Sequence, residues 1–324
     1  MNADIEHLPV AKQFSVLNLF RSYGLIWALV LLCLVASLTS SHFLQLANLV
    51  NVLRQVALSG IAGVGLTFVI LTAGIDISVG AIVGVVVVVG ATLLNMNLPF
   101  WAVILLGAGL GACFGMLNGL GVIVGKVPPF IMTLGMMVMA RGLAFTLSQG
   151  QPVALGDEVA DAVSWLGNGN LLAIPVPVWI FAAVCAIAFV VLRYTPYGRA
   201  IYAVGSNPEA ARLSGINVRL TIFSVYLVSG LLAGITGLIF ISRLTVGEPT
   251  AGTGMELEAI TIAVIGGTSL FGGEGGIVGT IIGAAILVVL ANFMNLMGVS
   301  PFSQQIVKGA IIICAVLFEM RKKK

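Results

Sequence analysis

Long apolar runs separated by short polar breaks fill the chain from residue 24 onward. A helix needs about 20 mostly apolar residues to cross the hydrocarbon layer of a bilayer. Ten runs approach or reach this length, so the pattern predicts an all-α, polytopic membrane protein with about ten spans. The predicted spans are 24–40, 50–72, 78–96, 99–123, 128–148, 176–193, 220–242, 256–271, 276–297 and 301–319.

Some boundaries between these runs are sharper than others. Residues 77–125 hold no charged side chain and are too long for one span, so we divide them at Asn95, Asn97 and Pro99. Residues 40–60 and 243–275 are less regular. Short or re-entrant segments in these two stretches are an alternative to full spans.

Basic residues are distributed unevenly across the predicted loops. With the N-terminus inside, the outside segments hold only Arg243, and the 149–175 loop carries three acids and no base. Lysine and arginine accumulate in cytoplasmic loops. We therefore expect both termini in the cytoplasm, with an N-terminal segment 1–23, a membrane domain 24–319 and a basic tail 320–324. The membrane domain then includes a cytosolic loop at 194–219.

Composition supports the membrane class. The chain has 324 residues, of which 59% are hydrophobic and 8% are charged, whereas soluble domains carry about a quarter charged residues. Forty glycines favour helices that approach one another closely. The four cysteines lie inside apolar runs without a CxxC spacing, so they are interpreted as small apolar side chains rather than as metal ligands or disulfides.

Three cations, Arg54, Arg141 and Lys308, fall inside or at the edges of predicted spans. A charge at the bilayer centre costs about 2.5–3.5 kcal/mol or more. Each cation is therefore expected to face protein, water or an interface. Extension of the side chain toward the lipid headgroups is the alternative.

The longest polar interruption between two apolar runs, residues 198–219, contains the signals of a short helix. Each position carries a residue type preferred there: Asn207 at the N-cap, Pro208 and Glu209 in the first turn, Arg212 in the last turn and Gly215 at the left-handed end. A helix of about two turns is not stable alone in water. Either the protein's own loops or a partner must hold it.

No catalytic constellation is evident. His7 and His42 lie far apart in sequence, and GVIVGKV (121–127) lacks the GxxxxGK[ST] spacing of a phosphate-binding loop. The sequence therefore predicts no ATPase in this chain. The glycine-rich run 266–276 joins two apolar runs rather than a strand and a helix, so a tight turn with close packing explains it best.

Few ionisable or polar side chains lie within the spans. Asp76 and Ser78 either cap the third span, or Asp76 has a role in gating or in contact with a cytosolic partner. An ion-driven carrier usually keeps carboxylates near mid-membrane, and this pattern lacks them. Asn118, Asn292 and Gln304 are candidates for lining a path for a hydroxyl-rich solute, with hydrogen bonding between helices as the alternative.

Several motifs resemble those of the permease subunits of ribose-type bacterial ABC sugar importers. The similarity extends from about residue 25 to residue 318. The motifs that carry it are LTAGIDISVG (71–80), GRAIYAVGSNPEAARLSGINV (198–218), PTAGTGMELE (249–258), IGGTSLFGGEG (265–275) and GVS (298–300). Each is weak alone, but their order and spacing together are specific to the family.

The resemblance implies a non-catalytic permease of the bacterial inner membrane that works by alternating access, usually as a dimer. It implies a cytosolic ABC ATPase that binds ATP and Mg²⁺, and a periplasmic sugar-binding protein. It implies no cofactor in this chain and no nucleic-acid partner. The expected ATPase-docking residues are Gly198 and Arg199 at the start of the loop, Asn207, Pro208, Glu209, Ala210 and Ala211 in the docking helix, and Gly215 at its end.

Two other functions remain open at this point. Permeases for branched-chain amino acids share the architecture that the resemblance implies. A stand-alone secondary carrier is the other alternative, although the lack of mid-membrane carboxylates speaks against it. The sequence does not identify the sugar, and ribose comes first only because the resemblance is to that group.

Overall fold

A computed structural model describes residues 24–322, so the predicted cytoplasmic segment 1–23 and the last two residues of the tail lie outside the described part. The described chain is almost entirely helical. Its helices are α2 (Gly24–Thr39), α3 (Leu46–Leu71), α4 (Val79–Asn95), α5 (Phe100–Ile123), α6 (Pro129–Leu147), α7 (Asp157–Asn168), α8 (Val176–Tyr194), α9 (Pro196–Ser206), α10 (Pro208–Leu213), α11 (Val218–Leu244), α12 (Met255–Ile265), α13 (Ile277–Leu296) and α14 (Pro301–Lys322).

Each of the ten predicted spans coincides with one of these helices. Six of them, α3, α5, α6, α8, α11 and α13, are long and apolar enough to cross a membrane, and α2 and α4 are shorter apolar helices. The predicted span 256–271 is wrong at its end, because α12 has only 11 residues and stops at Ile265. A turn formed by residues 266–276 follows, in which three glycines adopt left-handed φ angles before a fourth reaches +138°. The predicted tail 320–324 begins within α14.

The 149–175 loop contains structure that the hydropathy pattern did not predict. The amphipathic helix α7 lies in it, with two acids in its first turn. The two-residue strand β1 (Val153–Ala154) precedes α7 and pairs antiparallel with β4 (Val246–Gly247), the segment that follows α11. After α7, β2 (Asn170–Leu171) and β3 (Ile174–Pro175) form a hairpin. The β1–β4 pairing connects the loop to the end of α11.

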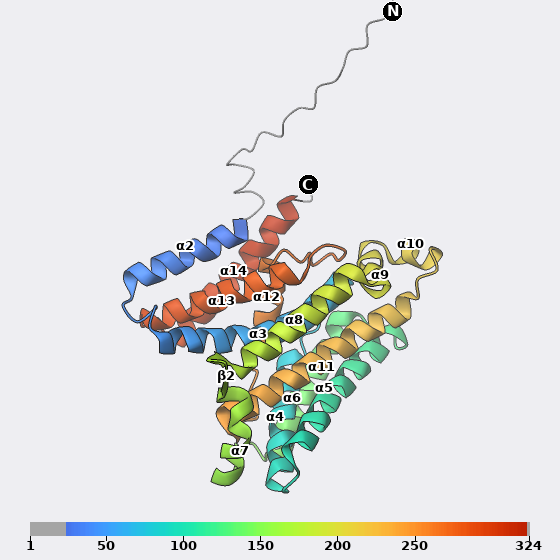
Figure 1. The fold of residues 1–324 in the computed structure, drawn as a ribbon. Helices are drawn as coiled ribbons and strands as arrows, with labels where there is room; N and C mark the ends of the chain where they lie inside the picture. Colours follow the sequence, from blue (N-terminus) through green and yellow to red (C-terminus); the bar gives the residue numbers. More distant parts are fainter. Residues whose placement is uncertain (1–23, 323–324) are drawn as a thin grey trace, which may run out of the picture.

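Helix α3 lies in the middle of the bundle, and its buried residues take part in three hydrophobic clusters. One cluster joins it to α4, α5 and α11, a second to α8 and α11, and a third to α2 and α13. Helix α4 is also enclosed, since every residue from Val79 to Val88 is buried, as is every residue of α3 from Ala57 to Leu71. In Figure 1, α4, α5, α6 and α11 lie on one side of α3 and α2, α13 and α14 on the other.

Helices α5 and α11 cross without side chains between their backbones. Gly111 and Gly115 on α5 face Gly230 and Gly234 on α11, and a Cβ atom added to Gly111 would lie 2.4 Å from the carbonyl oxygen of Gly230. Small residues spaced four apart allow this approach, and dispersion contacts then hold the helices together where the surrounding lipid gives no hydrophobic driving force. The high glycine content therefore has one clear structural use at this crossing.

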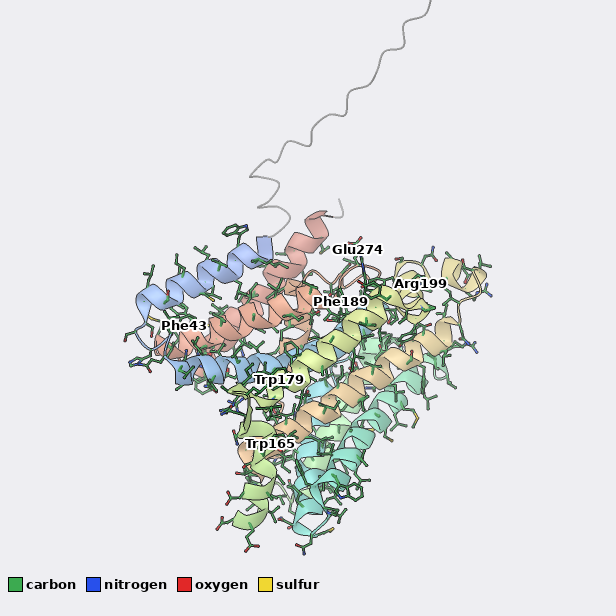
Figure 2. The ribbon with its side chains drawn as sticks, viewed as in Figure 1. Phe43, Trp165, Trp179, Phe189, Arg199 and Glu274 are labelled. Atoms are coloured by element: carbon green, nitrogen blue, oxygen red, sulfur yellow. The ribbon has the colours of Figure 1, made fainter. Side chains whose placement is uncertain are left out.

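One end of the molecule carries α9, α10 and the turn that follows α12 (Figure 1). Arg199 and Glu274 lie at this end, and Phe189 lies nearby on α8 (Figure 2). Trp179 lies at the other end of α8, where its indole nitrogen donates to the carbonyl of Leu171 at 3.1 Å. A tryptophan with a hydrogen-bonded polar edge is typical of a membrane–water interface.

Candidate functional site

Helix α9 begins directly after α8 through a sharp change of direction. The hydroxyl of Thr195 accepts a hydrogen bond from the amide of Gly198 at 3.1 Å and caps the helix. Gly198 is buried, and a Cβ there would lie 2.4 Å from the carbonyl oxygens of Val191 and Leu192. The two residues predicted at the start of the loop thus differ in exposure. Gly198 is packed inside the turn, and Arg199 is exposed.

Helix α10 has the caps that the sequence predicts. The side-chain oxygen of Asn207 accepts hydrogen bonds from the amides of Glu209 and Ala210, both at 3.0 Å. Gly215 adopts a φ of +83°, and the amide of Ile216 bonds back to the carbonyl of Ala211 at 3.0 Å. These bonds occupy polar backbone groups at both ends of a helix of only six residues.

The acidic and basic side chains of α10 bind each other. Arg212 donates to Glu209 through Nη2 at 2.6 Å and through Nε at 3.2 Å, and both side chains are about two-thirds exposed. The hydrogen bond from Arg212 lowers the pKa of the Glu209 carboxyl. The pair therefore holds one face of α10 in a defined arrangement without burying charge.

The exposed face of α10 differs from the predicted one at two positions. Ala211 is only 4% exposed because it packs inward, so Ala210 but not Ala211 is free to contact a partner. Leu213, which the sequence reasoning missed, is 75% exposed at the end of the helix. Its position one residue after the arginine of the last turn gave no signal, because hydropathy alone does not distinguish an outward from an inward leucine.

A backbone contact joins α9 to the interior of the bundle. A Cβ on Gly205 would lie 1.8 Å from the carbonyl oxygen of Leu71, the last residue of α3. The same carbonyl accepts a hydrogen bond from the amide of Gly273 at 2.9 Å. The ends of α9 and α3 and the turn after α12 therefore meet at one point.

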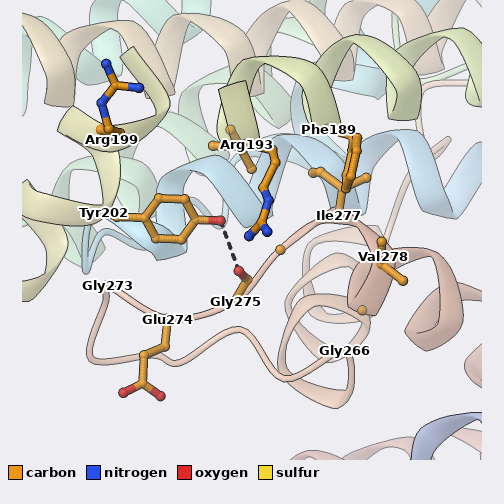
Figure 3. Close-up of a pocket in the computed structure, with 13 residues that line it drawn as sticks. Phe189, Arg193, Arg199, Tyr202, Gly266, Gly273, Glu274, Gly275, Ile277 and Val278 are labelled. Carbon is orange, nitrogen blue, oxygen red and sulfur yellow. Dashed lines mark hydrogen bonds between the residues drawn. The ribbon is translucent and has the colours of Figure 1, made fainter. Parts of the chain in front are cut away.

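A cavity of about 710 Å³ lies beside this junction, between α8, α9 and the start of α13. Tyr202 crosses its wall and donates to the carbonyl of Gly275 at 3.0 Å, and burial raises the pKa of its phenol. Arg193 extends along the same wall, whereas the carboxylate of Glu274 points away from it (Figure 3). The cavity is therefore basic on one side.

Asp76 lies in the connection between α3 and α4 and is completely buried. One of its oxygens accepts hydrogen bonds from the amide of Ser78 at 3.0 Å and from its hydroxyl at 2.6 Å. The other accepts from the hydroxyl of Ser229 on α11 at 2.8 Å. The Ser78 side chain does not cap α4, but the Asp76 carboxylate accepts from the amide of Ser78 at the start of this helix and also links it to α11. A role in gating stays a prediction.

The three residues predicted to line a path occupy different environments. Asn118 is buried and donates to the hydroxyl of Ser78 at 2.8 Å. Asn292 on α13 exchanges two hydrogen bonds, of 2.8 and 3.1 Å, with Asn48 on α3. These contacts match the alternative of bonding between helices. Gln304 on α14 donates to its neighbours and also lines a cavity of about 260 Å³.

Two of the three unusual cations bind backbone carbonyls. Arg54 donates to the carbonyl of Asn168 at 2.7 Å, and Arg141 donates to those of Pro249 at 2.7 Å and Ala251 at 3.0 Å. Both guanidinium groups therefore face protein, as expected. Arg54 thereby holds the end of α7 against α3, and Arg141 holds the segment between α11 and α12 against α6.

The third cation, Lys308 on α14, forms an ion pair with Glu258 on α12. Both side chains are mostly buried, at 27% and 29% exposed. Ser59 on α3 donates to the second oxygen of the carboxylate at 3.3 Å. The sequence singles out Lys308 but gives no reason to pair it with Glu258, since 50 residues separate them.

Comparison with known proteins places these features in a family. The family model described as the permease component of the branched-chain amino acid transport system matches residues 48–316. The ribose import permease protein RbsC of Escherichia coli K12 is 44% identical over 313 residues, 96% of this chain and 97% of that protein. RbsC of Bacillus subtilis is 42% identical over 312 residues, 96% of each chain.

A third relative is named for a different sugar. The L-arabinose transport system permease protein AraH of E. coli K12 is 34% identical over 313 residues, 97% of this chain and 94% of that protein. No solved structure matches this chain. The resemblance predicted from the motifs is thus confirmed along nearly the whole sequence. The chain belongs to the permease family whose model is described as the permease component of the branched-chain amino acid transport system.

Proposed function

We propose that this chain is the permease subunit of an ABC importer in the bacterial inner membrane that moves ribose or a related monosaccharide from periplasm to cytoplasm. The observation that carries this proposal is sequence similarity. Over nearly its full length, the chain is similar to permeases named for ribose and L-arabinose. The family description names branched-chain amino acids, so import of these amino acids is the second candidate.

The proposal includes about ten membrane crossings with both termini in the cytoplasm. Six described helices have the length and apolarity of spans, α2 and α4 are shorter apolar helices, and α12 has only 11 residues. The distribution of lysine and arginine supports the orientation. This topology puts α9, α10 and the 266–276 turn on the cytoplasmic side.

In this arrangement α10 is the element that docks on a separate cytosolic ATPase, which binds ATP and Mg²⁺. Its caps stabilise a helix that would not persist alone, and its outer face presents Leu213 beside the Glu209–Arg212 pair. Gly205 lies on α9, the helix that precedes α10, and its contact with the end of α3 connects α10 to the bundle through α9. The complete importer would also contain a second copy of the permease and a periplasmic binding protein.

Reconstitution tests the proposal. The chain is inserted into proteoliposomes with the ABC ATPase and the binding protein encoded beside it, and uptake of labelled D-ribose is measured with and without ATP. Labelled leucine is measured in parallel. We expect ATP-dependent uptake of the sugar and none of leucine, because the relatives that match along the whole chain are named for sugars.

Other outcomes would identify the alternatives. Leucine uptake without sugar uptake would favour the branched-chain amino acid permease. Transport by the chain alone, driven by an ion gradient, would favour a secondary carrier. Ligand binding by the neighbouring binding protein identifies the sugar itself, and failure of that protein to bind any monosaccharide would overturn the proposal.

A further inference from the structure

Two arginines line the cavity of about 710 Å³ between α8, α9 and the start of α13. Arg193 lies in the last turn of α8 and extends along the cavity wall toward Gly275, and Arg199 lies on α9 (Figure 3). Within the described chain, neither guanidinium takes part in an ion pair or donates a hydrogen bond. Glu274, the acid that lines this cavity, points its carboxylate away. The cavity therefore holds positive charge that no described residue neutralises.

The opposite wall of the cavity is the start of α13, a helix of 20 residues. Gly276 is its N-cap and has no side chain to cap it. The amides of Ile277, Val278 and Gly279 form no hydrogen bond within the described chain, as is usual for the first turn of an uncapped helix. These amides and the positive end of the helix dipole add to the charge of the arginines.

Apolar and aromatic side chains lead from the cavity along both helices. Phe189, one turn before Arg193 on α8, and Val278 line the cavity and are 39% and 57% exposed. Tyr194 lies at the end of α8, with its ring edge-to-face on Phe189 at a centroid distance of 6.1 Å. Exposed aromatic rings at the end of a span are typical of the membrane–water interface. In the proposed topology, the cavity thus lies at the level of the inner-leaflet headgroups.

We propose that this cavity binds the phosphate group of an anionic phospholipid, with the acyl chains along the exposed apolar faces of α8 and α13. Arg193 offers a planar pair of donors that matches two phosphate oxygens, and the amides at the start of α13 offer further donors. A soluble phosphate has the same anionic group but no use for the apolar faces. The proposal goes beyond sugar import and rests on the proposed function only for the side of the membrane on which the cavity lies.

The first test measures lipid binding to the purified full-length permease in detergent by native mass spectrometry. The protein is titrated with phosphatidylglycerol, with phosphatidylcholine of the same acyl chains, and with phosphatidylglycerol in the presence of inorganic phosphate. We expect phosphatidylglycerol to bind at least fivefold more tightly than phosphatidylcholine. Arg193→Gln should weaken its binding about fivefold, the usual effect of one basic residue at a membrane surface. Arg199→Gln should have a smaller effect in the same direction.

Arg219→Gln is the matched control. Arg219 is exposed in the first turn of α11, on the same side of the membrane in the proposed topology, and it does not line the cavity. Its loss should leave the affinity for phosphatidylglycerol unchanged. Equal weakening in Arg193→Gln and Arg219→Gln would reduce the effect to general attraction between cations and headgroups, and the site would be overturned.

A second pair of variants changes the charge of the cavity while both arginines remain. The backbone at Gly276 is extended, with a φ of 167°, and a Cβ added there would meet only the hydroxyl of Tyr202, at 3.8 Å. Aspartate and asparagine are both favoured at an N-cap, so Gly276→Asp and Gly276→Asn should fold. The aspartate places a negative charge where the phosphate would lie. We expect Gly276→Asp to bind phosphatidylglycerol at least fivefold more weakly than Gly276→Asn.

Other results would overturn the proposal. These are equal affinity of the wild type for the two lipids, unchanged binding in Arg193→Gln, and equal binding by the two Gly276 variants. Displacement of the lipid by an equal concentration of inorganic phosphate would assign the site to a soluble anion instead. Weaker association with the ATPase in Arg193→Gln, with lipid binding unchanged, would assign the cavity to that protein. Because lipid binding is measured without transport, failure of sugar uptake in the reconstituted importer would overturn the proposed function alone.

Discussion

The crossing of α5 and α11 is formed by bare backbone, whereas the contact of α12 with α14 is formed by long charged side chains. At the first, glycines place backbone against backbone, with Gly111 and Gly230 too close to admit a methyl group. At the second, the long side chains of Lys308 and Glu258 meet with cavities on both sides. Backbone contacts have no second arrangement, whereas long side chains have many rotamers. The comparison indicates a fixed frame on one side of α3 and an adjustable contact on the other.

The largest expected effect comes from filling the glycine crossing. In Gly230→Ala the new methyl group would lie 2.3 Å from the carbonyl oxygen of Gly111 and 2.7 Å from the Cα of Gly115, so the helices must move apart. We expect a loss of stability of about 1–3 kcal/mol or more, measured as a lower melting midpoint of the purified protein in detergent.

Gly109→Ala is the matched control for this substitution. Gly109 lies on α5 as well, but a methyl group added there would meet no atom within 4 Å beyond its own stretch of helix. Its melting midpoint should equal that of the wild type or exceed it slightly, since alanine favours helix over glycine. Equal loss in both alanine variants would show that the crossing has no special rigidity.

A smaller loss of stability is expected where helices are held together by a buried side-chain hydrogen bond rather than by backbone packing. Ser229→Ala removes the hydroxyl that donates to Asp76 at 2.8 Å and leaves a buried carboxylate oxygen without that donor. We expect a cost of about 1–3 kcal/mol, again measured by melting. Thr236→Val is the control, because the Thr236 hydroxyl bonds only to a carbonyl of its own helix. Similar losses in both variants would argue against a linking role for Asp76.

These two cases also show what the sequence could and could not predict. The apolar runs located the long helices, and the local signals from Asn207 to Gly215 were sufficient for α10, because caps depend on neighbours within a few residues. The partner of Asp76 is 153 residues away, and Asn48 and Asn292 are 244 residues apart. Hydropathy gives no information on which helices are neighbours, so these hydrogen-bonded pairs could not be predicted from the sequence.

The ends of the short helices were also hard to predict. The run 256–271 is apolar enough to suggest one span, yet α12 stops at Ile265, because the glycines that follow adopt conformations that leave the helical region. The amphipathic α7 was missed because its low apolar content gives no membrane signal. The pairing of Glu258 with Lys308 required the three-dimensional arrangement.

A third prediction concerns α10, an exposed helix that belongs neither to the glycine crossing nor to the contact of α12 with α14. Leu213→Ser should leave the melting midpoint almost unchanged, because this side chain is 75% exposed. If α10 docks on the ATPase, the same change should lower ATP-dependent uptake about tenfold or more, as loss of an interface anchor does. Leu44→Ser, at an exposed position in the loop before α3, should not reduce uptake. Normal uptake by the Leu213 variant would remove this residue from the docking surface.

The smallest effect is expected for the exposed ion pair of α10. Because Arg212 lowers the pKa of Glu209, the pair favours the folded state above the carboxyl's ordinary pKa, and this contribution is lost as pH falls through the lowered value. Both side chains are about two-thirds exposed, so the melting midpoint of Arg212→Ala should equal that of the wild type from pH 5 to pH 8. A drop as large as that of Ser229→Ala would contradict the distinction between exposed and interior contacts.

The contact of Gly205 with the carbonyl of Leu71 has a consequence for how force travels through the protein. Two backbones in direct contact leave no compressible layer of side chains between them, so we expect a displacement of α9 to be passed on to the end of α3. A bulkier residue there would act as a spacer and change the resting angle between the two helices. The stroke length of the transporter would then depend on one missing methyl group.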